Sequence, residues 1–116
     1  MNAPVEDDLR PVKCIGMETV VAAPDLTIDH VFQARERINP YIHNTPILTS
    51  TYLNERIGAE LFFKCENFQK AGAFKVRGAC NSVFGLVNED AVSGVATHSS
   101  GNHALSLSYA AGRRGI

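Results

Sequence analysis

The chain has 116 residues and a mass of 12.6 kDa, which suits one compact domain and leaves no room for two domains with a cleft between them. Eleven Lys and Arg residues oppose twelve Asp and Glu residues, and a net charge of −1 provides no field of one sign for nucleic acid or anionic lipid. A chain that is 45% hydrophobic and 20% charged is neither disordered nor fibrous, so we expect a packed core.

Targeting and redox signals favour an ordinary cytoplasmic protein. No apolar run approaches the roughly 20 residues that a membrane-spanning helix needs. The first ten residues contain acidic side chains and no basic cluster ahead of an apolar core, which is not the pattern of a secretory signal. The three cysteines are odd in number and lack C-x-x-C spacing, so we expect reduced thiols rather than a disulfide framework or a zinc knuckle.

The first half of the chain predicts an arm and two helices. Residues 1–26 mix acidic residues, prolines and scattered valines without a period, and predict a disordered or extended N-terminal arm. Apolar residues at helical spacing follow Thr27, a favourable N-cap, and predict a helix that stops before Pro40. Ser50 can cap a second, short helix whose end is marked by Gly58.

The second half alternates strand and helix signals. Residues 60–65 are rich in large apolar side chains and predict a buried strand, and residues 94–98 predict another. A helix is expected from about Phe74, with four residues on its apolar face: Val76, Ala79, Cys80 and Val83. A further helix is expected from His103 until Gly112 ends it. Strand, helix, strand and helix in this order predict a parallel α/β sheet.

In such sheets, sites form where a strand runs through a loop into the next helix. The first such loop places Lys75 in the first turn of a helix, where the positive end of the helix dipole disfavours a further cation. A neutral amine is the form that attacks a carbonyl carbon to give a Schiff base, and Gly72 and Ala73 leave space beside it. The alternative is that Lys75 is a solvated surface lysine, which is the commoner role of this residue.

The second loop, residues 99–103, opens a helix. Its backbone N–H groups converge on a point where a carboxylate or phosphate can sit. Ser100 and Asn102 add a hydroxyl and an amide, and Gly101 lets the backbone approach a ligand closely. The alternative is that Ser-x-x-His is an ordinary N-cap sequence. His98 and His103 stand on different faces across the turn, so we predict no metal site.

Three segments together resemble a known enzyme family. Residues 66–79 (ENFQKAGAFKVRGA) resemble the lysine motif of the fold-type II pyridoxal-phosphate enzymes. Residues 97–104 (THSSGNHA) resemble the family's substrate and cofactor loop, and residues 44–47 (NTPI) its early Thr-Pro segment. The order and spacing agree from about residue 30 to the last residue, and the branch that fits is serine/threonine dehydratase (threonine ammonia-lyase) and serine racemase.

The resemblance implies a fold and a cofactor. The fold is α/β with a three-layer parallel sheet, a partial tryptophan synthase beta-like fold, in which residues 27–116 form the N-terminal part of one incomplete domain. The cofactor is pyridoxal 5′-phosphate. The expected partners are a small amino-acid substrate and further copies of the chain, with neither nucleic acid nor membrane. The nine glycines are dispersed, so the glycine run with which the family binds the cofactor phosphate is not in this sequence.

The resemblance also implies roles for single residues. Lys75 would be the Schiff-base lysine, Phe74 would lie against the cofactor ring, and Asn102 would bond the ring's 3-hydroxyl. Ser100 is a candidate acid/base on the face opposite Lys75. Five residues would surround the substrate carboxylate: Ser99, Ser100, Gly101, Asn102 and His103. Ala71 and Ala73 stand where family members often have hydroxyl residues, which removes hydrogen bonds but keeps the small volume.

The implied reaction is that of an ammonia-lyase. Loss of the β-hydroxyl from an L-serine- or L-threonine-type amino acid would give a 2-oxo acid and ammonia, in a chain that looks truncated. One alternative is serine racemase-type activity, in which Ser100 returns the α-proton from the opposite face. The other is a non-catalytic fragment that binds a partner through its uncovered sheet or helix faces.

Overall fold

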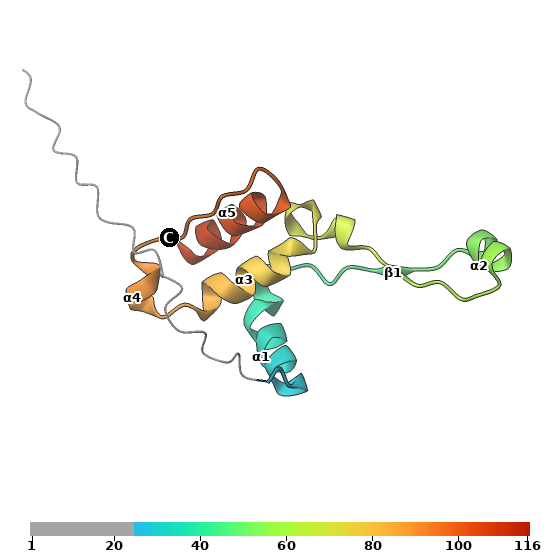
Figure 1. The fold of residues 1–116 in the computed structure, drawn as a ribbon, viewed down its shortest axis with the longest axis horizontal. Helices are drawn as coiled ribbons and strands as arrows, with labels where there is room; N and C mark the ends of the chain where they lie inside the picture. The colour runs from blue at the N-terminus through green and yellow to red at the C-terminus, as the bar shows by residue number, and fades with distance from the viewer. Residues whose placement is uncertain (1–24) are drawn as a thin grey trace, which may run out of the picture.

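A computed structural model of the chain describes residues 25–116, so the arm expected over residues 1–26 lies outside the described residues except for its last two. The elements follow in the order α1 (Ile28–Ile38), η1 (Asn39–Tyr41), β1 (Ile47–Leu48), α2 (Thr51–Ile57), β2 (Phe63–Lys64), η2 (Glu66–Phe68), η3 (Lys70–Gly72), α3 (Lys75–Gly85), α4 (Asn88–Ala91) and α5 (Asn102–Arg114). Helices α1, α3, α4 and α5 gather in one body (Figure 1). Residues 46–65, which we call the extension, project from it and carry β1, α2 and β2. Within residues 25–116, no helix has both the length and the apolar content to cross a membrane.

The core of the helical body lies where α3 packs against α5 and α1. The predicted apolar face of α3 is confirmed, since all four of its residues are buried. The core consists of Ile38 from α1, Val76, Ala79, Cys80 and Val83 from α3, and Ala110 from α5. Full burial of a valine side chain contributes about 1.5–3 kcal/mol, so α3 anchors the body through its two central valines.

Helix α1 has the predicted bounds and is tied to the other helices through η1. The backbone N–H of Thr27, the residue before α1, donates to His30 Nδ1 over 3.1 Å. The ring of Tyr41 in η1 stacks on Phe84, with 3.7 Å between the ring centroids. The Tyr109 hydroxyl of α5 donates to the carbonyl of Tyr41 over 2.7 Å. Tyr41, in the turn that follows α1, is thus held by both α3 and α5.

Helix α5 was expected to end at Gly112, and this expectation is wrong. The helix continues to Arg114 and ends at Gly115, whose φ of 79° is the left-handed conformation that glycine adopts easily. The Arg114 guanidinium donates to the carbonyl of Leu86 over 2.9 Å and also to that of Val83, both at the end of α3. These bonds hold the last turn of α5 in place, so the helix passes through Gly112.

The short helix α2 forms as predicted at the tip of the extension. Ser50 is its N-cap, and its hydroxyl accepts from the Leu53 N–H over 3.4 Å. Gly58 ends the helix with a φ of 73°. The Asn54 side chain also accepts from the Leu61 N–H over 3.0 Å, which returns the chain toward the body. Local caps therefore account for this helix without a core around it.

The strand expected over residues 60–65 is shorter and more exposed than predicted. Only Phe63–Lys64 is strand, and it pairs antiparallel with β1, Ile47 opposite Lys64 and Leu48 opposite Phe63. The side chain of Phe62 is 68% exposed. The prediction of burial is wrong, since both residues of β1 and both residues of β2 are exposed.

The strand expected over residues 94–98 does not form, and α4, which no sequence signal indicated, precedes it. A parallel strand needs a neighbouring strand to complete its hydrogen bonds. In the described part of the chain the other expected strand pairs with β1, so residues 94–98 have no partner. The parallel pairing is therefore absent from residues 25–116, and only a two-stranded antiparallel sheet is present there.

Candidate functional site

Lys75 is the first residue of α3 and is exposed. Phe74 precedes it, and the Lys75 Nζ lies 5.9 Å from the centroid of the Phe74 ring. That ring is 65% exposed, so amine and ring form an open surface together. This exposure is compatible with a reactive amine and equally with a solvated surface lysine.

The second predicted loop is also exposed along its whole length, residues 99–103. Gly101 is the N-cap of α5, which begins at Asn102, and no side chain caps the helix there. The Ser99 hydroxyl accepts from the Gly101 N–H over 3.3 Å. The capping alternative would have made Ser100 the N-cap, and this is wrong. The first N–H groups of α5 are therefore left without a side-chain acceptor in the described part of the chain.

The fold brings these two loops to one end of the helical body. Helices α3 and α5 pack along each other and run in the same direction, so their N-terminal ends lie together in Figure 1. Helix α5 also contacts η3, the turn just before α3. Two segments far apart in sequence, the start of α3 with Lys75 and the uncapped start of α5, therefore lie at the same end of the body.

An ion pair that the sequence analysis did not single out lies at the base of this end. Arg77, in the first turn of α3, donates from Nε to Glu66 Oε2 and from Nη2 to Glu66 Oε1, each over 2.7 Å. The Thr45 hydroxyl donates to Glu66 Oε1 over 2.5 Å, and Lys64 Nζ donates to the Thr45 carbonyl over 2.6 Å. The hydrogen bonds from Arg77, joined by that from Thr45, lower the pKa of Glu66 to about 2. The signal that could have found the pair is an acid and an arginine on either side of Lys75.

Gln69 holds the loop between Glu66 and α3 in place. Its side chain is nearly fully buried, and its Oε1 accepts from the N–H groups of His43 over 2.7 Å and Lys70 over 2.9 Å. Its Nε2 donates to the His43 carbonyl over 2.8 Å. The loop then passes through two left-handed residues, Ala71 at φ 58° and Gly72 at φ 66°. For alanine this conformation costs free energy, so the bonds of Gln69 hold a strained turn.

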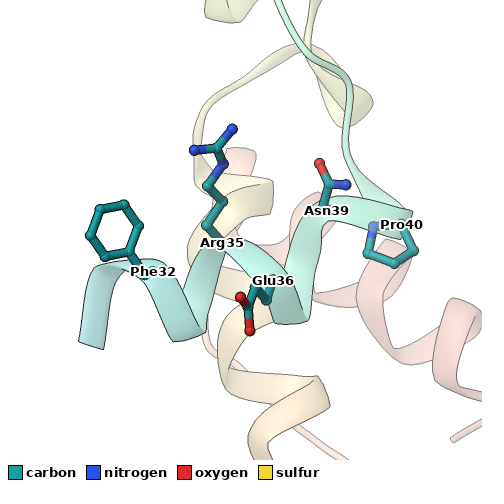
Figure 2. Close-up of a pocket in the computed structure, with 5 residues that line it drawn as sticks. All are labelled: Phe32, Arg35, Glu36, Asn39 and Pro40. Atoms are coloured by element: carbon teal, nitrogen blue, oxygen red, sulfur yellow. The ribbon is translucent and has the colours of Figure 1, made fainter. Parts of the chain in front are cut away.

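Two pockets in the described part of the chain lie away from these residues. One, of about 440 Å³, follows an exposed stripe of α1 and η1 and is lined by Phe32, Arg35, Glu36, Asn39 and Pro40 (Figure 2). The other, of about 460 Å³, lies between α4 and the end of α5. Neither includes a predicted site residue, and the predicted residues at that end of the body are exposed. Residues 25–116 contain no group of three His, Cys, Asp or Glu side chains arranged for a metal ion.

The side chains at the open end fit part of the cofactor that the resemblance implies. They offer the Lys75 amine for an aldehyde, the Phe74 ring beside a planar group, and the Asn102 amide for a hydroxyl. A Cβ added at Gly72 or Gly101 would meet no atom within 4 Å, so both turns border open space. The fit covers the aldehyde and ring, whereas no glycine run is available for the phosphate.

Comparison with known proteins bears on the fold and the family. The chain is 67% identical over 90 residues to beta-hydroxyaspartate dehydratase of Paracoccus denitrificans, covering 78% of this chain and 29% of that protein. The solved structure of maize serine racemase superposes with a TM-score of 0.75 at 56% identity, covering 77% of this chain and 28% of that one. The solved structure of serine racemase from Dictyostelium discoideum gives a TM-score of 0.76 at 53% identity, covering 78% and 30%. A solved threonine deaminase gives a TM-score of 0.67 at 37% identity, covering 78% and 32%.

These similarities confirm the expected fold class, because the helices and the small ribbon match part of the fold-type II enzymes. The chain spans between 28% and 32% of the length of these relatives. The sequence profile of a family described as "Pyridoxal-phosphate dependent enzyme" matches residues 38–116, which confirms the expected cofactor. The chain therefore belongs to the family of pyridoxal-phosphate-dependent enzymes.

Proposed function

We propose that Lys75 is the lysine to which pyridoxal phosphate attaches, and that the protein is a dehydratase of L-serine- or L-threonine-type hydroxy amino acids. The products are a 2-oxo acid and ammonia. The observation that carries the proposal is the common end of α3 and α5, where Lys75 is the first residue of α3 and the α5 terminus has no side-chain cap. The names of two relatives, a beta-hydroxyaspartate dehydratase and a threonine deaminase, support the substrate class.

Lys75 has two tasks in this reaction. When bound, the cofactor supplies an electron sink for the α-carbon of an amino acid. Lys75 Nζ would hold the cofactor through its aldehyde carbon, and after displacement by the substrate amine it would be free to accept the α-proton. Phe74 offers an apolar surface beside the amine, and the Asn102 amide can donate to a ring hydroxyl.

The loop before α5 holds the other end of the substrate. The N-terminus of a helix of 13 residues carries a partial positive charge, and its free N–H groups suit a carboxylate. The side chains of Ser99, Asn102 and His103 stand around the same terminus and can add hydrogen bonds. A carboxylate held there fixes which bond of the α-carbon faces Lys75, and this orientation selects the proton that is removed.

A serine racemase is the second candidate, favoured by the 56% identity to the maize enzyme. In a racemase, the exposed hydroxyl of Ser100 returns a proton to the face opposite Lys75. In a dehydratase, the β-hydroxyl leaves before any proton returns. Both outcomes need the same lysine, so the fate of the α-carbon distinguishes them.

Reductive labelling of the 116-residue chain tests the role of Lys75. After addition of pyridoxal phosphate and then borohydride, peptide mapping measures the fraction of each lysine that carries the cofactor. We expect the label mainly on Lys75. Lys64 and Lys70 are internal controls, since Lys64 Nζ already donates to a backbone carbonyl. Equal labelling of Lys70 and Lys75, or no label on Lys75, contradicts the assignment.

Product analysis then separates the activities. Release of ammonia and a 2-oxo acid from L-serine, L-threonine or hydroxyaspartate supports the dehydratase, and formation of D-serine measured by chiral chromatography supports the racemase. The Lys75→Ala variant is the control and should abolish either product. Label on Lys75 without any product supports the third alternative, a fragment with a reactive amine that turns nothing over.

A further inference from the structure

The first turn of α3 is held to the chain in front of it by the Glu66–Arg77 ion pair. Arg77 follows Lys75 by two positions and binds both carboxylate oxygens of Glu66, each over 2.7 Å. A guanidinium that engages a carboxylate through two parallel bonds fixes orientation as well as distance. The pair therefore sets the angle at which α3 leaves the loop. Lys75 lies in the first turn of α3, whose direction the pair fixes.

The carboxylate of Glu66 is in turn fixed by the neighbouring chain. Thr45 is 5% exposed and donates to Glu66 Oε1 over 2.5 Å, while its carbonyl accepts from Lys64. The side chain of Glu66 is only 18% exposed, so little solvent competes for it. The carboxylate is thus a fixed point between the base of the extension and α3.

The ion pair also decides which cation the carboxylate holds. Glu66–Arg77 is the one salt bridge within residues 25–116, and Lys75 takes part in none there. The guanidinium occupies both oxygens of Glu66, so this carboxylate is paired with Arg77 and not with the lysine two positions earlier.

We infer that Glu66 and Arg77 are positioning residues for Lys75, because their ion pair holds the first turn of α3 so that the amine and the N-terminus of α5 face one ligand. The inference rests on the proposed function, since it takes Lys75 as the lysine that holds the cofactor. Neither residue touches the ligand. Their effect reaches the amine through Val76, the one helical residue between Lys75 and Arg77, and through the loop that Gln69 holds.

The test measures how fast pyridoxal phosphate becomes fixed on Lys75. The amine nitrogen adds to the aldehyde carbon, the aldehyde oxygen leaves as water, and hydride from borohydride reduces the resulting carbon–nitrogen bond. Glu66→Gln removes the charge at constant size, and Arg77→Lys keeps the charge but loses the planar fork. Asn81→Ala is the matched control, since it removes another arginine bond to α3, the 2.5 Å contact with Arg37, farther along the helix.

We expect labelling of Lys75 to slow by about tenfold or more in Glu66→Gln and in Arg77→Lys, because small misplacement of a reacting group is costly. The double variant should be no slower than either single variant, since each single substitution already breaks the same ion pair. Asn81→Ala should label at the rate of the unmodified chain. The ratio of label on Lys75 to label on Lys70 gives a readout within each molecule.

Circular dichroism selects a temperature at which each variant is folded, and if Glu66→Gln does not fold, Arg77→Lys decides the outcome. Unchanged labelling of Lys75 in a folded Glu66→Gln or Arg77→Lys variant overturns the positioning role while leaving the proposed function intact. Absence of label on Lys75 in the unmodified chain overturns the proposed function and the inference with it.

Discussion

The helical body and the extension are ordered by different forces. In the body, Val76, Cys80 and Val83 are no more than 1% exposed, and apolar contacts between α3, α5 and α1 hold the structure. In the extension, Ile47 and Phe62 are 61% and 68% exposed, and order comes from caps and backbone hydrogen bonds. The comparison shows that similar apolar content gives a core only where the topology brings apolar faces together.

The largest expected effect tests the difference in burial. Val83→Ala removes two methyl groups from the core and should lower the free energy of unfolding by about 2–3 kcal/mol, through lost burial and the cavity left behind. Phe62→Ala removes a larger side chain from the extension and should change it by less than about 0.5 kcal/mol. Urea unfolding followed by circular dichroism measures both. A larger loss in Phe62→Ala would show that the extension is buried in solution.

The second effect concerns the joint between the two regions, where Glu66 binds Arg77 and Thr45. The pKa of Glu66 is lowered from 4.5 to about 2, so its stabilisation is fully present above pH 4.5 and is lost as the pH falls toward 2. Glu66→Gln should cost about 2 kcal/mol at pH 7, and this difference from the unmodified chain should vanish near pH 2. Urea unfolding at several pH values measures it. A difference that stays constant with pH would exclude the ion pair as its cause.

The third effect compares glycines in the two regions. Gly58 closes α2 with a φ of 73°, and an added Cβ would meet no atom within 4 Å, so Gly58→Ala costs only the backbone strain of about 1 kcal/mol. Gly78→Ala, in the middle of α3 and equally unobstructed, should stabilise by about 0.5–1 kcal/mol. Hydrogen exchange should locate the first change in α2 alone. Faster exchange in α3 of Gly58→Ala would show that the regions unfold together.

The smallest effect is expected in the loop before α3. Ala71 has a φ of 58°, so Ala71→Gly relieves strain and should raise the free energy of unfolding by about 0.5 kcal/mol after the entropy cost of glycine. Ala73→Gly is the control, because Ala73 is extended and buried and gains nothing from glycine. Thermal unfolding of both variants measures the difference. Equal destabilisation by the two substitutions would mean that position 71 is unstrained.

The parts of the fold that could be predicted depend on neighbouring residues. The bounds of α1, the caps of α2 and the buried face of α3 follow from spacing and from single residues such as Ser50. The strand over 94–98 failed because a strand needs a partner, and none lies beside it in the described part of the chain. The end of α5 was misjudged because its last turn depends on Arg114 bonds to carbonyls on another helix.

In the candidate site, too, features with local sequence signals could be predicted and contacts between distant residues could not. The placement of Lys75 in the first turn of a helix, and of a loop just before the last helix, could be predicted, since a lysine at a helix start and a Ser-Gly-Asn turn have local signals. The bonds that hold the site could not, because the pairs Glu66–Arg77 and Gln69–His43 join residues whose complementarity shows only when the chain is folded. Whether Lys75 acts as the sequence predicts stays a prediction for the labelling experiment.

The connection between α4 and α5 has a consequence for how the site is assembled. It crosses the body from the far end of α3 back to the near end of α5, so that the two helices run in the same direction (Figure 1). Lys75 and the loop before α5 therefore belong to separate pieces of chain that meet where α5 packs against α3 and η3. A cut within residues 93–98 leaves both halves of the site whole, and the two fragments should reassemble around the shared core. Binding of pyridoxal phosphate at that end of the body would then measure how well α5 docks against α3.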